Sequence, residues 1–97
     1  MKETQIEQKL VRAVKHSGGI APKLVCPGQD GMPDRILLLS GGRIAFVEVK
    51  APGEKPRPLQ LRRHEQLRRL GFAVYILDRP EQIEKVLEDL NNGKQHD

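Results

Sequence analysis

Two acidic residues and one lysine have the types and spacing needed to activate a water molecule on a metal ion. Pro33-Asp34 is followed, after thirteen intervening residues, by Glu48-Val49-Lys50, a P-D…E-x-K pattern. Two carboxylates supply the hard oxygen ligands that Mg²⁺ prefers, while the ion keeps waters and substrate phosphate. The ion stabilises charge on a phosphate and makes water more nucleophilic, and Lys50 could orient that water or hold a phosphate oxygen. The pattern therefore predicts metal-assisted hydrolysis of a phosphodiester.

A single β-hairpin would bring these side chains together. Residues 35–39 form a continuous apolar run typical of a buried strand, 40–42 read as a tight turn, and 43–50 read as the next strand. Side chains alternate along a strand, so one face of the second strand should carry Ile44, Phe46, Glu48 and Lys50. Asp34 lies at the start of the first strand, Glu48 and Lys50 lie at the end of the second, and starts meet ends in an antiparallel pair. Alone, Glu48-Val49-Lys50 could equally be an ordinary surface ion pair of little energetic value.

The remaining patterning predicts one domain over residues 1–97, with 93–97 as a frayed tail. Apolar periodicity and stop signals predict helices at 4–17, 59–70 and 81–91. Strands are predicted at 20–26, 35–39, 43–50 and 72–77. Loops at 27–33 and 51–58 are rich in proline and glycine. The predicted order is therefore α-β-β-β-α-β-α.

Composition limits the classes of function that fit. The chain has 17 Lys and Arg against 13 Asp and Glu, a formal net charge of +4, which favours polyanionic partners. Its few aromatic residues, Phe46, Phe72 and Tyr75, argue against a stacking platform for single strands and favour duplex backbone. Cys26 is the single cysteine and no apolar stretch could span a bilayer, so we expect a reducing, cytoplasmic setting without membrane contact.

The sequence also resembles a known family in several segments. These are the loop 28–35 (G-x-x-G-x-P-D-R), the run 48–53 (E-V-K-A-P-G), Pro58-Leu59-Gln60, and residues 70–74 (L-G-F-A-V). Together they resemble the VRR-NUC domain, the virus-type replication-repair nuclease branch of the PD-(D/E)xK superfamily. The similarity covers nearly the whole chain, which resembles a minimal standalone version of the domain. It implies an α/β fold with a restriction-endonuclease-like αβββαβ core, a mixed central sheet flanked by helices, and an extra C-terminal helix.

The resemblance also implies roles for individual residues. Asp34, Glu48 and Glu7 would be metal ligands for Mg²⁺ or Mn²⁺, Lys50 the catalytic amine, and Gln60 a supporting residue on the second helix. Two of these residues have simpler alternatives. Glu7 completes a capping-box pattern that begins at Thr4, in which it would bond back to the helix start. Gln60 could merely cover the N-terminus of its own helix.

Positively charged residues flank the predicted site and could contact DNA. The candidates for this rim are Lys23, Arg35, Lys55 and Arg57. The arginines further along the second helix are as readily explained by a solvated helix face. The three histidines show no metal-ligand spacing and are expected to be incidental, although His64 stands one turn beyond Gln60.

The resulting prediction is a Mg²⁺- or Mn²⁺-dependent DNA endonuclease. One small domain has one active site, so cutting both strands would need a homodimer with two-fold symmetry. The resemblance further implies selectivity for branched DNA such as Holliday junctions, and a bacterial or phage setting. The alternative is a non-catalytic DNA-binding or adaptor module in replication or repair. A sequence-specific restriction enzyme is disfavoured because no element is left over to read base edges.

Overall fold

The computed structural model describes residues 1–92, so the tail predicted at 93–97 lies outside the described residues. In chain order its elements are α1 (Glu3–His16), β1 (Arg35–Leu39), the short 3-10 helix η1 (Ser40–Gly42), β2 (Arg43–Val49), α2 (Pro58–Arg69), β3 (Ala73–Leu77) and α3 (Glu81–Asn91). These bounds agree with the predicted helices and strands to within one residue, except at the segment 20–26.

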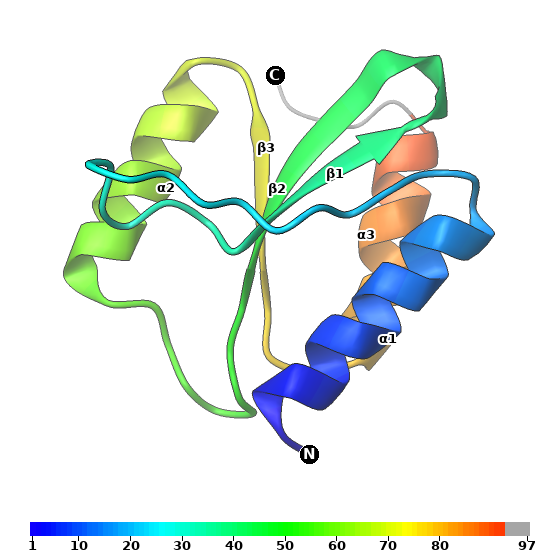
Figure 1. Cartoon of the computed structure of the whole chain (residues 1–97), viewed down its shortest axis with the longest axis horizontal. Helices are drawn as coiled ribbons and strands as arrows, with labels where there is room; N and C mark the ends of the chain where they lie inside the picture. Colours follow the sequence, from blue (N-terminus) through cyan, green and yellow to red (C-terminus); the bar gives the residue numbers. More distant parts are fainter. Residues whose placement is uncertain (93–97) are drawn as a thin grey trace.

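The strand β2 is the centre of a mixed three-stranded sheet of order β1-β2-β3. It is antiparallel to β1, to which η1 joins it, and parallel to β3, to which it connects through α2. The helix α2 covers one face of this sheet, and α1 and α3 lie together on the other (Figure 1). The predicted α/β fold with a mixed central sheet flanked by helices is confirmed.

Each face of β2 packs against a different layer, as its alternating sequence predicts. The residues facing α1 and α3 are Ala45, Val47 and Val49, all buried. On the opposite face, Phe46 packs with Leu67 of α2, and its ring meets that of Phe72 edge-on at 5.5 Å. Glu48 shares this face with Phe46, so its carboxylate is directed toward α2.

The segment 20–26, predicted to be a strand, runs beside β1 without forming one. It makes two isolated antiparallel bridges, Ile20 with Leu38 and Lys23 with Arg35. Between them the carbonyl of Pro22 accepts the N–H of Ile36, but a proline has no N–H to donate in return. An antiparallel ladder needs both hydrogen bonds of such a pair, so the proline interrupts the strand.

The helices α1 and α3 are fixed to the sheet by apolar side chains spaced three or four residues apart. The buried ones are Ile6, Leu10 and Val14 of α1 and Ile83, Val86 and Leu90 of α3. Burying one such side chain contributes about 1.5–3 kcal/mol, so together they hold both helices firmly against the sheet. No helix within residues 1–92 is long and apolar enough to cross a membrane.

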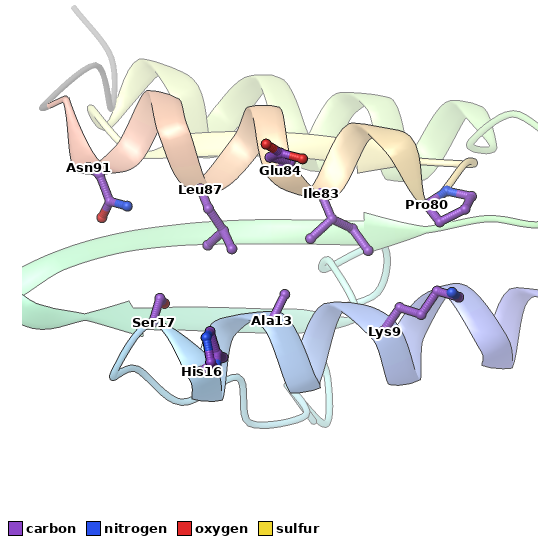
Figure 2. Close-up of a pocket in the computed structure, with 9 residues that line it drawn as sticks. All are labelled: Lys9, Ala13, His16, Ser17, Pro80, Ile83, Glu84, Leu87 and Asn91. Atoms are coloured by element: carbon purple, nitrogen blue, oxygen red, sulfur yellow. The ribbon is translucent and has the colours of Figure 1, made fainter.

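A shallow groove runs between α1 and α3 on the side of the sheet away from Glu48. Ala13, Ile83 and Leu87 contribute apolar surface to it, and Lys9 and Glu84 add charges from the two helices (Figure 2). Because the sheet separates this groove from Glu48, the groove is not part of the candidate site described below.

Candidate active site

The hairpin places Asp34 opposite Glu48, at the end of the sheet where β1 begins. Arg35 pairs with Val47 in the antiparallel register, so the next pair outward is Asp34 with Glu48. Asp34 Oδ2 accepts the backbone N–H of Val49 at 2.8 Å, which fixes this side chain against β2. Residues in such cross-strand pairs have Cβ atoms about 4.5–5.5 Å apart, so the two carboxyl groups face a common space.

Asp34 is surrounded by other acidic groups. Its partial burial raises its pKa from 3.8 to about 6, and the negative charges of Glu48, Glu3 and Glu7 act in the same direction. The hydrogen bond from Val49 opposes this increase in pKa, because it favours the ionised form. Burial, followed by the nearby carboxylates, therefore disfavours the ionised form of Asp34.

Glu48 is almost completely buried, with 1 % of its surface exposed. The amide nitrogen Nε2 of Gln60 donates to Glu48 Oε2 at 2.9 Å, and Lys50 Nζ lies 3.5 Å from the same oxygen. On the other side of the carboxylate, His64 Nε2 lies 3.4 Å from Oε1. Buried charges need such partners, and α2 supplies two of the three.

Gln60 serves both of the roles that its sequence position suggests. It stands in the first turn of α2, where its Oε1 accepts the backbone N–H of Arg57 at 2.7 Å and thereby caps the helix. Its Nε2 is then left free to donate to Glu48. One amide group therefore joins the start of α2 to the buried carboxylate of β2.

Glu7 is not the capping residue that the Thr4 pattern suggested. The helix begins one residue earlier than predicted, and Gln5 caps its N-terminus by accepting the backbone N–H of Lys2 at 2.8 Å. Glu7 Oε2 instead accepts Arg35 Nε at 2.8 Å. Its charge also acts on Asp34, so Glu7 lies at the margin of the acidic cluster.

The four basic residues predicted to contact DNA have different surroundings. Arg35 is largely enclosed: besides Glu7 it donates to the carbonyl of Ala21 at 2.8 Å, and its side chain is 17 % exposed. Lys23, Lys55 and Arg57 are exposed. These three can reach a large ligand, whereas Arg35 holds Glu7 in place.

The glycine-rich loop before Asp34 packs on the start of α2. Gly31 has a φ of +82°, and a Cβ atom there would lie 2.9 Å from the carbonyl oxygen of Leu59. Arg63 Nε of α2 also donates to the carbonyl of Asp30 at 3.2 Å. The loop that leads to Asp34 and the helix that carries Gln60 are therefore held against each other.

The oxygen donors present fit a divalent cation such as Mg²⁺. Mg²⁺ binds proteins through one or two carboxylates and retains several waters, which matches the pair Asp34 and Glu48. Glu48 Oε1 is buried and has no hydrogen-bond partner within residues 1–92, as expected of an oxygen whose partner is an ion. Within those residues no group of three or more His, Cys, Asp or Glu side chains forms a complete cage, so substrate and water would supply the other ligands.

His64 is the residue that sequence analysis undervalued. Lacking metal-ligand spacing, it was expected to be incidental, yet it is fully buried against Glu48. The available signal was its position four residues after Gln60, which places both side chains on one face of α2.

A mixed sheet that carries Asp, Glu and Lys at the end of one hairpin, backed by a helix with a glutamine, is the arrangement of PD-(D/E)xK domains. Comparison with known proteins specifies the branch. A solved structure of a VRR-NUC domain matches with a TM-score of 0.84 and 35% sequence identity, covering 91% of this chain and 96% of that one. A curated relative, "Putative nuclease p44" of Acyrthosiphon pisum secondary endosymbiont phage 1, is 54% identical over 78 residues, which are 80% of this chain and 84% of the relative. No protein-family model matches the sequence. The chain belongs to the VRR-NUC family.

Proposed function

We propose that this protein is a Mg²⁺- or Mn²⁺-dependent DNA endonuclease. The observation that carries the proposal is the convergence of Asp34, Glu48 and Lys50 at one end of the hairpin. Family membership supports nuclease chemistry, and both the VRR-NUC structure and the phage relative bear names that denote nucleases. Carboxylates repel a phosphate, so a site that only bound DNA would not place Asp34 and Glu48 beside one. A catalytic role therefore explains these two residues better than binding alone.

Asp34 and Glu48 would hold the divalent ion, and Glu7 could supply a third carboxylate from α1. When bound, the ion supplies charge neutralisation at the phosphate and a more acidic water. The water oxygen attacks phosphorus and gives up one proton to solvent, the opposite P–O bond breaks in line, and the leaving oxygen takes a proton from solvent. Gln60, which donates to Glu48 Oε2, would hold that carboxylate in a fixed orientation.

Lys50 would contribute positive charge at the attacked phosphate. Its amine lies 3.5 Å from Glu48 Oε2 and its side chain is 16 % exposed, so it can reach the solvent side of the carboxylates. A cation held in place before the reaction stabilises charge that develops in the transition state. Replacing Lys50 should therefore lower the cleavage rate more than it lowers the affinity for DNA.

The substrate class proposed is duplex or branched DNA, such as a Holliday junction, with a homodimer as the working form. Exposed Lys23, Lys55 and Arg57 and the net charge of +4 suit a phosphate backbone. One domain has one site, and a two-fold dimer would present two sites to two strands. The phage origin of the relative suggests action inside an infected bacterial cell.

The test is cleavage of labelled linear duplex, flap and four-way-junction DNA with Mg²⁺, Mn²⁺ or EDTA. The expected result is metal-dependent cutting that Asp34→Ala and Lys50→Ala abolish, with symmetric paired cuts in the junction if the dimer is the active form. DNA that is bound but never cut with either metal would contradict the proposal and indicate a binding or adaptor module instead.

A further inference from the structure

Three buried polar atoms lie together at the contact between α2 and β2. His64 is 0 % exposed, and its Nε2 lies 3.4 Å from Glu48 Oε1. Within residues 1–92, Nδ1 and Nε2 of His64 and Oε1 of Glu48 have no aligned hydrogen-bond partner. A buried polar group without a partner costs about 1–3 kcal/mol, so an ordinary core position would be better filled by leucine.

The surroundings of Glu48 give this histidine a specific relation to the site. Gln60 donates to Oε2, and Lys50 lies on the side of that same oxygen. His64 is the ring that faces Oε1, one helical turn further along the same face of α2. The two oxygens of one carboxylate are therefore approached by two side chains of one helix.

We propose that His64 is a positioning residue for Glu48. Its Nε2–H donates to Oε1 once the site is assembled, and with Gln60 it fixes the plane of the carboxylate. Each carboxylate oxygen keeps a second lone pair, so the hydrogen bond leaves Oε1 able to bind a cation. Hydrogen bonds of unliganded active sites are commonly long or misaligned and tighten on loading, as the contact at 3.4 Å would.

This inference rests on the proposed function, because it concerns how Glu48 meets a divalent ion. A histidine that only fills space would behave differently on substitution. Any apolar side chain of similar size would then serve equally well, and metal affinity would not depend on a donor at this position. Comparing a side chain that can donate a hydrogen bond with an apolar side chain of similar size at position 64 therefore distinguishes the two roles.

The experiment measures Mn²⁺ binding to the DNA-free protein, by electron paramagnetic resonance of the unbound ion. His64→Leu and His64→Phe keep apolar volume without a donor, whereas His64→Gln keeps an N–H donor at a similar reach. His16→Leu, at an exposed position of α1, is the control. Loss of an outer partner of a metal ligand typically lowers metal affinity about 10–100-fold. We expect that loss in the Leu and Phe variants and recovery of most of the affinity in His64→Gln.

The possible results distinguish a donor role of His64 from a packing role. Thermal unfolding in EDTA shows which variants are folded. Unchanged Mn²⁺ affinity in a folded Leu or Phe variant would overturn the inference. So would an equal loss in His64→Gln, since the position would then matter through packing alone. Failure of the proposed function is distinguishable, because it would appear in the wild-type protein as absence of Mn²⁺ binding and of metal-dependent cleavage.

Discussion

The carboxyl group of Asp34 sits where burial and the nearby charge of Glu48 make its ionised form costly. Asp34 responds with a pKa of about 6, and Glu48 depends on donors from α2. Such a site is unfavourable for the fold when empty and favourable when a cation is bound, since a ligand that binds only the folded state stabilises it. At the scale of single residues, the burial of Asp34 therefore lowers stability at neutral pH, and a cation bound as proposed would offset that loss.

Asp34→Asn should stabilise the metal-free protein. The folded pKa of about 6 lies above the ordinary value of 3.8, so the folded state binds more protons between these values. The contribution of Asp34 to wild-type stability is then fully present below about pH 4 and is lost as pH rises through about 6. Asparagine can still accept the Val49 N–H. Allowing for solvent screening of this half-buried group, we expect a gain of about 1 kcal/mol at pH 7.5.

Urea unfolding in EDTA at pH 4 and pH 7.5 measures this difference between Asp34→Asn and wild type. The two proteins should have similar stability at pH 4 and diverge at pH 7.5, with the variant the more stable. A variant less stable than wild type at pH 7.5 would show that Asp34 is not strained by its neighbours.

At the scale of elements, the start of α2 joins the glycine loop, the helix cap and the buried glutamate. Gln60→Glu separates two of these functions, because the new carboxylate can still accept the Arg57 N–H but now repels Glu48. We expect a loss of about 2 kcal/mol or more at pH 7.5, as for a buried charged group deprived of its partner, and a smaller loss at pH 5. Gln66→Glu, exposed on the same helix, should change stability by less than about 0.5 kcal/mol. Equal losses in the two variants, measured by chemical denaturation, would refute the role assigned to Gln60.

Gly31→Ala tests the contact between the loop and α2. The substitution combines an unfavourable positive φ with a Cβ 2.9 Å from the Leu59 carbonyl, so the loop must move away from the helix. Gly28→Ala is the matched control, since its φ is +79° but nothing lies within 4 Å of the added atom. The left-handed backbone alone costs about 1–2 kcal/mol. We expect Gly31→Ala to lower the unfolding temperature and the rate of DNA cleavage clearly more than Gly28→Ala does. Equal effects of the two substitutions would contradict the contact between the loop and α2.

The sequence predicted the elements well wherever local patterns decide the structure. The apolar run 35–39, the Gly41-Gly42 turn and the alternation in β2 indicated the hairpin and placed Glu48 on the same face as Phe46. That α2 covers this face comes from the structure. The strand at 20–26 was wrong because Pro22 removes a ladder donor that periodicity does not register. The Glu7–Arg35 pair and the burial of His64 depend on how α1 and α2 dock, which spacing along the chain does not encode.

At the scale of the whole molecule, basic side chains and the acidic site occupy neighbouring surfaces. Lys55 and Arg57 lie in the exposed loop between β2 and α2, next to the site residues that flank it, Lys50 and Gln60. Each phosphate neutralised by Lys or Arg releases counterions, so DNA affinity should weaken steeply with salt.

Lys55→Ala and Arg57→Ala should each reduce the salt dependence of DNA binding. We expect the slope of log affinity against log salt to decrease by about 1 for each phosphate that the variant no longer neutralises. Lys85→Ala, on α3 across the sheet and paired with Asp89, is the control and should leave the slope unchanged. Fluorescence anisotropy in EDTA, where no cleavage occurs, measures all three. A change in slope for Lys85→Ala alone would place the DNA on the opposite face.

The carboxylates and the lysine at the end of the hairpin are expected to hydrolyse DNA together. The most direct test is single-turnover cleavage of a labelled four-way junction by wild type and Lys50→Met in Mg²⁺, with junction affinity measured in Ca²⁺. We predict that the variant binds the junction within a few-fold of wild type and cuts it at least about 100-fold more slowly. Cleavage at the wild-type rate by Lys50→Met, or cleavage by either protein in EDTA, would contradict this joint role.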